Sequence, residues 1–158
     1  MWYADVGTAV HALIEGTEPT YPADTLWNQD APAHATIAYA NYLEFLESTG
    51  WQQTAAELEV YGVLDPADRV GYVGHCDAVY DTGDGESVVV DFKTCGRVRV
   101  RHRHQMQVAA YVNALPCTKG YLLYLSRDTI GEWELVEVDI DTNLQDFAAT
   151  HRLWLKST

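Results

Sequence analysis

An acidic and a basic side chain interrupt the apolar run Val-Val-Val-Asp-Phe-Lys-Thr at residues 88–94. Alternate side chains of a β-strand point to the same face, so Asp91 and Lys93 emerge side by side while Phe92 points to the opposite face. Removing a carboxylate and an ammonium from water costs free energy that an ordinary buried strand avoids. Such departures from the local pattern mark functional sites, so we expect chemistry at this strand end.

Further acidic residues precede this strand. Asp77 lies 14 positions before Asp91, and a tight hairpin would let the two carboxylates converge. Paired carboxylates repel each other unless a cation lies between them, and their hard oxygen ligands suit Mg²⁺ or Mn²⁺. Glu57 and Glu59 share one face of an earlier strand, so one of them could reach the same metal, although an ordinary solvated strand face would look identical. Lys93 could hold or deprotonate a water at this site.

Two pairs at helical spacing add polar groups. His11 follows Gly7 by four positions, and Tyr111 follows Gln107 by the same interval. Residues four apart lie on one helix face, so each pair can act on the same neighbour. Taken alone, a single helical histidine is more often structural than a metal ligand, and a Gln/Tyr pair at this spacing also occurs by chance.

Positive charge is concentrated directly after Lys93. The chain has 10 basic and 23 acidic residues and a formal net charge of -13, which repels a polyanion at long range. Four of the ten basic residues nevertheless fall within one short stretch, at Arg97, Arg99, Arg101 and Arg103. A charge run usually marks a solvated edge or loop. Its position beside the suspected site favours phosphate contacts instead.

The apolar periodicity predicts two helices, three strands, a third helix, two strands and a closing helix. The helices are expected at 5–15, between the loop at 17–32 and Gly50, at 105–115 and at 142–156, and the strands at 54–63, 70–81, 86–93, 120–126 and 133–140. Turns at Asp-Pro-Ala-Asp, residues 65–68, and at Thr-Gly-Asp-Gly, residues 82–85, join the first three strands into a meander.

Length and composition set the class of protein. A chain of 158 residues has room for one compact domain, and no run of about 18 apolar residues indicates a membrane span. The N-terminus shows no secretory signal, so we expect an intracellular, cytoplasmic protein. Cys76, Cys95 and Cys117 form no Cys-x-x-Cys pair, and their odd number argues against a disulfide framework.

Taken together, these motifs resemble, in type and order, the motif series of RecB-like nucleases in the PD-(D/E)XK superfamily, the branch that includes CRISPR-associated and phage exonucleases. The series is Gly7-x-x-x-His11, Glu57, Gly74-x-x-Asp77, Asp91-x-Lys93-Thr94 and Gln107-x-x-x-Tyr111, over residues 7–111. Each motif is loose by itself, but the ordered set is specific. The absence of helicase motifs and the short segment before Gly7 fit a stand-alone, phage-like nuclease.

The resemblance implies an α/β fold with a restriction-endonuclease-like αβββαβ core, a mixed central sheet flanked by helices, over a single domain at 1–158. It further implies a divalent-metal-dependent deoxyribonuclease, in particular an exonuclease of DNA processing or recombination. The implied metal positions, for one or two Mg²⁺ or Mn²⁺ ions, are His11, Glu57, Asp77, Asp91 and Phe92. The resemblance assigns catalysis to Lys93 together with Glu57, Asp77 and Asp91. It assigns support of the site and positioning of DNA to Gln107 and Tyr111.

The partners that this resemblance implies are single- or double-stranded DNA ends. The four arginines would contact backbone phosphates, which gives affinity without base specificity. A homo-oligomer or a recombination partner protein is left open. Relatives that carry an iron-sulfur cluster use four cysteines flanking the domain, whereas this chain has three placed otherwise, so no cluster is expected.

Two other classes of protein fit parts of the pattern. A catalytically silent nuclease-like module would keep the fold and bind DNA or protein through the basic stretch, but it would not cleave DNA with either metal. An acidic interaction protein or DNA mimic would use the charge of -13 itself and would show no metal-dependent thermal shift. Neither class explains the ordered acids and the lysine.

Overall fold

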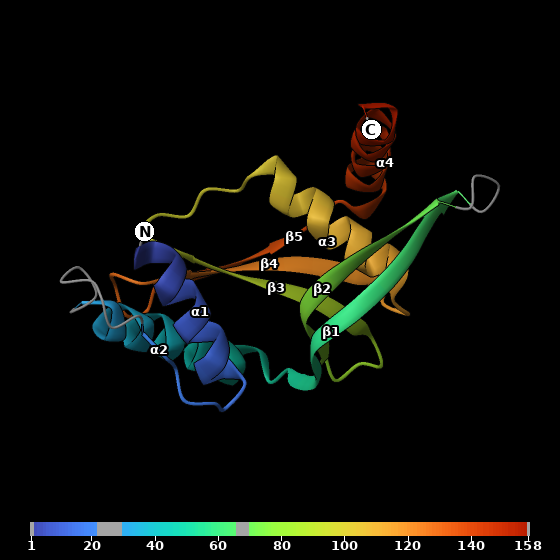
Figure 1. Ribbon diagram of the computed structural model, residues 1–158. Helices are drawn as coiled ribbons and strands as arrows, with labels where there is room; N and C mark the ends of the chain where they lie inside the picture. The colour runs from blue at the N-terminus through green and yellow to red at the C-terminus, as the bar shows by residue number, and fades with distance from the viewer. Residues whose placement is uncertain (1, 22–29, 66–69, 158) are drawn as a thin grey trace. The chain divides into compact units, whose positions relative to one another are not determined.

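The computed structural model describes residues 2–21, 30–65 and 70–157. Its elements follow the predicted order (Figure 1): α1 (Trp2–Ile14), α2 (Ala31–Thr49), β1 (Gln52–Asp65), β2 (Val70–Asp81), β3 (Ser87–Cys95), α3 (His102–Ala114), β4 (Lys119–Ser126), β5 (Trp133–Glu137) and α4 (Ile140–Ser157). The predicted turn at 65–68 lies, apart from Asp65, outside the described residues. None of the helices in the described ranges has the length and apolar character needed to cross a bilayer.

The described strands form one sheet in the order β1-β2-β3-β4-β5. β1 pairs with β2, and β2 with β3, in antiparallel fashion. β3 and β4 run parallel, because the carbonyl of Ser87 accepts from the amide of Thr118 near their starts and that of Cys95 accepts from Arg127 near their ends. β5 returns antiparallel to β4. The mixed sheet flanked by helices confirms the predicted α/β fold class.

The chain divides into two compact units. The first comprises Met1–Gly50, Phe92–Arg99 and Leu123–Leu135, and the second comprises Trp51–Asp91, Val100–Leu122 and Val136–Thr158. Strands β3, β4 and β5 each contribute residues to both units. The single nuclease domain expected over 1–158 stays a prediction.

In the first unit, α1 and α2 pack together and bury apolar side chains of the helices. Val6, Val10 and Phe45 have no exposed surface, and the ring of Phe45 meets Trp133 edge-on at 5.7 Å. In this unit α2 ends at Gly50, whose φ of 66° is a left-handed conformation that glycine adopts without strain. The unit therefore places two packed helices with the C-terminal halves of β3 and β4.

The second unit contains the β1–β2–β3 meander, α3 and α4. Its core is made by fully buried side chains of the strands and of α3, namely Tyr80, Val88, Val89, Val90, Val108 and Leu122. The turn at 82–85 forms as predicted: Gly83 and Gly85 have φ of 88° and 90°, and the Gly83 amide donates to Asp81 Oδ1 at 2.8 Å. The hairpin fixes the register of β2 against β3.

Candidate active site

Two carboxylates face each other across β1 and β2 in the second unit. The ladder pairs Leu58 with Cys76 and Ala56 with Ala78, so Glu57 stands directly across from Asp77. Directly opposed residues of an antiparallel pair point to the same face of the sheet. Carboxylate oxygens of Glu57 and Asp77 lie within 4.8 Å of each other, close enough to share a cation.

A third carboxylate continues this row on β3. The ladder between β2 and β3 ends with the pair Ala78 and Val90, so Asp77 and Asp91 each directly adjoin this pair on its own strand. Glu57, Asp77 and Asp91 therefore form one row across three neighbouring strands, which we call the carboxylate row. The proximity of the Glu57 and Asp77 oxygens is observed, and the convergence of Asp91 with them stays a prediction.

Burial increases along the carboxylate row. Glu57 is exposed, Asp77 is half-buried, and Asp91 is only 2% exposed. A carboxylate that deep in an apolar strand is costly unless other groups compensate its charge. Three negative groups in this arrangement match the donor set of a hard divalent cation.

The electrostatic effect of the row is visible on Cys76. Burial first, and then the negative charges of Asp77 and Asp91, raise the pKa of this thiol to about 12. A proton is therefore held on sulfur throughout the neutral range, and Cys76 donates to the carbonyl of Ala78 at 3.5 Å. Cys76 acts here as a small buried group of the strand.

Tyr111 of α3 contributes a hydroxyl to this side of the unit. Gln107 Nε2 donates to the Tyr111 hydroxyl oxygen at 2.7 Å, as their spacing predicts. Burial raises the pKa of Tyr111, and the charge of Asp91 and then of Asp77 raises it further. The phenol therefore keeps its proton and, because Gln107 occupies one of its acceptor positions, can donate a hydrogen bond.

Gly74, the glycine of the Gly74-x-x-Asp77 motif, leaves room for the ring of Tyr111. A Cβ at this position would lie 2.8 Å from Cε1 of Tyr111, a distance too short for any side chain. The missing side chain therefore lets the tyrosine ring approach β2 three residues before Asp77. The glycine serves the placement of Tyr111 and makes no turn.

The backbone at Glu57 is unusual. Its φ of 48° lies in the left-handed region, and among the described residues no other non-glycine residue has a positive φ. Such a conformation costs an L-residue about 1–2 kcal/mol. Glu59, the alternative ligand on the same strand, stands across from His75. The structure thus sets Glu57, and not Glu59, across from Asp77.

In the first unit, α1 passes close to the end of β3. The ring of His11 meets Phe92 edge-on at 5.7 Å, and a Cβ at Gly7 would lie 3.4 Å from Thr94 Oγ1. The ring of Phe92 is buried and also packs against Tyr42, at 5.6 Å. A Cβ at Gly7 would therefore make only an ordinary van der Waals contact, and a close approach that needs glycine stays a prediction.

Lys93 is half-buried and follows Asp91 by two positions on the continuous strand β3. Strand alternation directs the two side chains to the same face, while Phe92 turns into the apolar core. An ammonium thus follows the deepest carboxylate of the row, as the sequence predicts.

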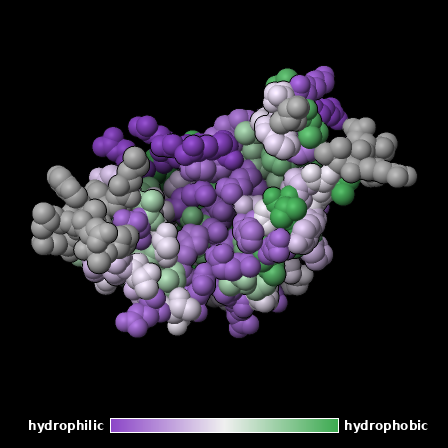
Figure 2. Space-filling view, viewed as in Figure 1, coloured by the Kyte–Doolittle hydropathy of each residue, from purple (hydrophilic) through white to green (hydrophobic). Residues whose placement is uncertain are grey.

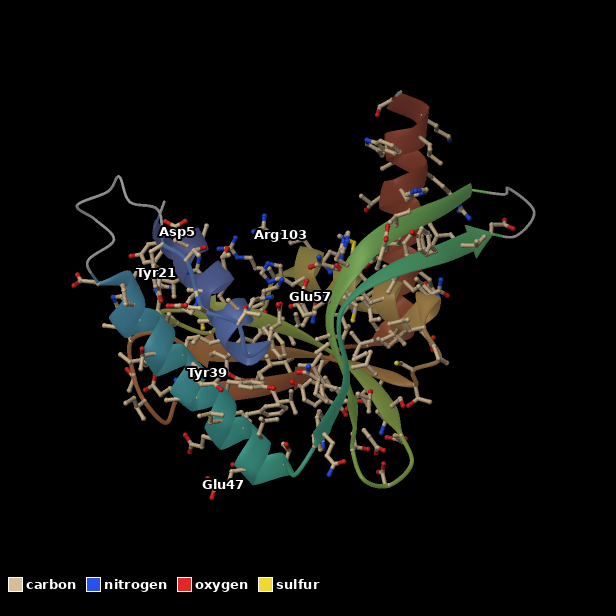
Figure 3. All side chains as sticks on the ribbon, turned by 60° about the horizontal axis from the view of Figure 1, so that its bottom comes forward. Asp5, Tyr21, Tyr39, Glu47, Glu57 and Arg103 are labelled. Carbon is tan, nitrogen blue, oxygen red and sulfur yellow. The ribbon has the colours of Figure 1, made fainter. Side chains whose placement is uncertain are left out.

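The basic stretch lies on the surface. Residues 96–101 form no helix or strand, and the side chains of all four arginines are exposed. Arg101 is the N-cap residue of α3, and Arg103 lies in its first turn, which has no acidic residue (Figure 3). Positive charge at a helix N-terminus opposes the helix dipole, whereas an anion there is stabilised. Figure 2 shows hydrophilic side chains gathered over this connection between β3 and α3.

Sequence reasoning did not single out two polar residues that the fold uses. The Tyr72 hydroxyl donates to the carbonyl of Ala110 at 2.6 Å and accepts from Asn113 at 2.9 Å, which ties β2 to α3. Asn41, in the first unit, is fully buried on α2. An asparagine on the apolar face of a predicted helix is a detectable signal, because a buried amide needs partners.

Comparison with known proteins gives one match in sequence. A segment of 68 residues is 32% identical to the CRISPR-associated exonuclease Cas4 of Saccharolobus solfataricus, and it covers 40% of this chain and 33% of that protein. This match supports the RecB-like branch of the PD-(D/E)XK superfamily. The chain spans about a third of the curated relative that it matches. No family model matches the sequence.

Two solved structures are similar in part. The structure of SSO0001 has a TM-score of 0.49 and 19% identity, over 80% of this chain and 62% of that one. The alkaline exonuclease LHK-Exo from Laribacter hongkongensis has a TM-score of 0.46 and 11% identity, over 96% of this chain and 80% of that one.

Proposed function

We propose that the chain is a metal-dependent DNA nuclease, in particular an exonuclease, that hydrolyses phosphodiester bonds. The observation that carries this proposal is the carboxylate row of Glu57, Asp77 and Asp91, followed on β3 by Lys93. A fold that only packed its sheet would not align three acids on neighbouring strands, because their mutual repulsion destabilises the empty arrangement. The partial match to an exonuclease supports the same activity.

The donor set fits Mg²⁺ or Mn²⁺, because the row offers only hard carboxylate oxygens and strand alternation directs the neighbouring Cys76 to the opposite face. We propose His11 and Phe92 as further metal positions, following the family motifs. Phe92 would contribute its main-chain carbonyl, since its ring is buried. A divalent ion bound here would polarise a phosphate oxygen and make a water more acidic.

The other residues of the site would bind and orient the substrate. Lys93 would hold the attacking water and offset negative charge that develops on the phosphate. Tyr111, which keeps its proton, would donate a hydrogen bond within the site, and Gln107 would fix the direction of that hydroxyl. The exposed arginines at 97, 99, 101 and 103 would contact the DNA backbone, so binding should weaken as salt increases.

The test is cleavage of end-labelled DNA, single- and double-stranded, linear and circular, in Mg²⁺ and in Mn²⁺. We expect degradation of linear DNA by the wild type and loss of activity in Asp77→Asn. Glu59→Gln is the matched control, since it removes an acid from the same strand as Glu57 but outside the row, and it should remain active. The product ladder reports polarity and whether a DNA end is needed.

The same assay can overturn the proposal. A wild type that cleaves nothing in either metal, or an Asp77→Asn variant as active as the wild type, would remove the enzymatic function. Retained DNA binding without cleavage would support a catalytically silent module. Absence of both cleavage and DNA binding, with no thermal shift in metal, would support an acidic interaction protein.

A further inference from the structure

The connection between β4 and β5 in the first unit is held by a buried amide. Asn41 of α2 is fully buried, and its Nδ2 donates to the carbonyls of Ser126 and Thr129, both at 2.9 Å. Its Oδ1 accepts from the amide of Gly131 at 2.7 Å. A single buried side chain thus makes three hydrogen bonds to the main chain of one surface loop.

The residue that this loop presents is Arg127. Its amide donates to the carbonyl of Cys95 at 2.9 Å, and its own carbonyl lies 2.8 Å from Nδ1 of His34, which donates to it. Both main-chain groups of Arg127 are therefore engaged, by β3 and by α2. The position of its Cα is determined by hydrogen bonds on two sides.

The side chain of Arg127 is positioned as well. The guanidinium carbon lies 4.0 Å from the centroid of the Tyr3 ring, a cation–π contact. On another side, a Cβ at Gly96 would lie 3.0 Å from Nη2 of Arg127, so the glycine leaves room for the guanidinium. The Nε of Arg127 is buried and has no hydrogen-bond partner among the described residues, so only the Nη groups can face a phosphate.

Arg127 thereby joins the basic stretch. Gly96 immediately precedes Arg97, Arg99 follows two positions later, and all of these residues belong to the first unit. A guanidinium is a planar fork of donors that matches a phosphate, and stacking on an aromatic ring orders it before binding. Arg127 and Arg97, which both adjoin Gly96, offer positive charge to a polyanion, with Asp128, Glu132 and Glu134 as acidic residues of the same neighbourhood.

We propose that Arg127 is a phosphate-binding residue of the DNA interface, preordered by Tyr3 and by the loop that Asn41 holds. The inference rests on the proposed nuclease function and names a part of its substrate contact that the motif series does not include. Arg127 would bind the backbone of the DNA and take no part in bond cleavage.

Asp128 offers the competing explanation. Its Oδ1 lies 3.2 Å from His34 Nδ1, and its Oδ2 would lie 2.9 Å from a Cβ at Gly96, on the side where Arg127 Nη2 also lies. If Arg127 served only to neutralise this carboxylate, loss of either residue would destabilise the protein and leave DNA binding unchanged. If Arg127 binds phosphate, removing the acid should strengthen DNA binding, because a repulsive charge disappears.

The two explanations are separated by fluorescence anisotropy with a labelled DNA duplex in EDTA, over 50 to 200 mM KCl, roughly the range in which phosphate contacts dominate. We expect Arg127→Gln to weaken binding about tenfold at the lowest salt, a typical loss for a charged hydrogen bond. The slope of log affinity against log salt should fall by about 0.9, the value for one phosphate contact. Asp128→Asn should bind at least as tightly as the wild type.

Two further variants complete the design. Arg152→Gln, on α4 in the second unit, removes the same charge outside the cluster and should bind like the wild type. Arg127→Lys keeps the charge but loses the planar fork, so its affinity should lie between those of the wild type and Arg127→Gln. If Arg127→Gln does not fold, Arg127→Lys should still bind DNA less tightly than the wild type. Melting temperatures show whether each variant is folded.

The inference is overturned if the wild type binds no duplex, or if Arg127→Gln and Arg152→Gln bind equally well. It is also overturned if Arg127→Gln and Asp128→Asn lower the melting temperature together without changing affinity. Binding is measured without divalent ions, so the two proposals can fail separately. If DNA is not cleaved but Arg127→Gln still weakens DNA binding, only the nuclease activity is refuted. Cleavage with unchanged affinity in Arg127→Gln would refute only the Arg127 inference.

Discussion

Removing the charge of Glu57 should stabilise the protein in the absence of metal. The Glu57 and Asp77 carboxylate oxygens lie within 4.8 Å of each other, and two unit charges at that separation in water repel by about 0.9 kcal/mol. The high dielectric constant is appropriate because Glu57 is exposed. Glu57→Gln keeps the shape of the side chain and should therefore raise the free energy of unfolding by about 0.9 kcal/mol in EDTA.

Glu57→Gly tests the backbone at the same position. The φ of 48° costs an L-residue about 1–2 kcal/mol, and glycine removes this cost. The greater entropy of glycine in the unfolded chain offsets about 0.5–1 kcal/mol of the gain. The glycine variant should therefore exceed the glutamine variant in metal-free stability by up to about 1.5 kcal/mol.

Divalent metal should reverse this order. At a concentration of about 100 times Kd, a bound ion stabilises a protein by about 2.7 kcal/mol. Both Glu57 variants should lose most of that gain. In a chain of this length 1 kcal/mol corresponds to roughly 2–4 °C in Tm, so thermal melts in EDTA and in Mn²⁺ resolve the difference.

The control for this experiment is Glu59→Gln, which removes an acid opposite His75 and should leave the metal-dependent shift intact. The reasoning is refuted if Glu57→Gln and the wild type melt alike in EDTA. It is refuted equally if Mn²⁺ raises the Tm of Glu57→Gln as much as that of the wild type.

Three further outcomes follow from the second unit. Gly74→Ala should lower the free energy of unfolding by about 1–3 kcal/mol, because its Cβ would lie 2.8 Å from Tyr111 Cε1. Urea titrations measure this loss. Adding Tyr111→Ala should recover part of it. Tyr72→Phe should lose about 1 kcal/mol, since it removes the hydrogen bond to Ala110, whereas an unchanged Tm would contradict that contact. Stability should fall as pH rises above 9, because the unfolded chain loses the Cys76 proton at a pKa near 9.0 and the folded chain retains it to about 12. Cys76→Ala should flatten this pH dependence in urea titrations at pH 8 to about 10.5, and an equal slope in both proteins would exclude the thiol as its cause.

The sequence predicts those features of the fold that depend on neighbouring residues in the chain. The order of helices and strands, the turn at 82–85 and the end of α2 at Gly50 follow from apolar periodicity and from residues that favour particular dihedral angles. Asp91 and Lys93 were identified for the same local reason, since charges two positions apart in an apolar strand break its pattern.

Other features of the site needed strand register. Glu57 and Glu59 are both glutamates on the same face of one strand, so the sequence alone leaves open which of them lies across from Asp77. The ladder between β1 and β2 sets Glu57 across from Asp77 and Glu59 across from His75. Long-range pairing decides this, because a shift of two residues would exchange the glutamates without changing the local pattern.

The sequence by itself determined which elements form and which residue types carry the chemistry, because periodicity, turn residues and misplaced charges are local properties of the chain. Only the tertiary structure decided which acids share a row, that Gly74 makes room for Tyr111, and that Asn41 and Tyr3 hold Arg127. These arrangements join residues that are far apart in the chain. Their geometry depends on how strands pair and helices pack, which no local pattern encodes.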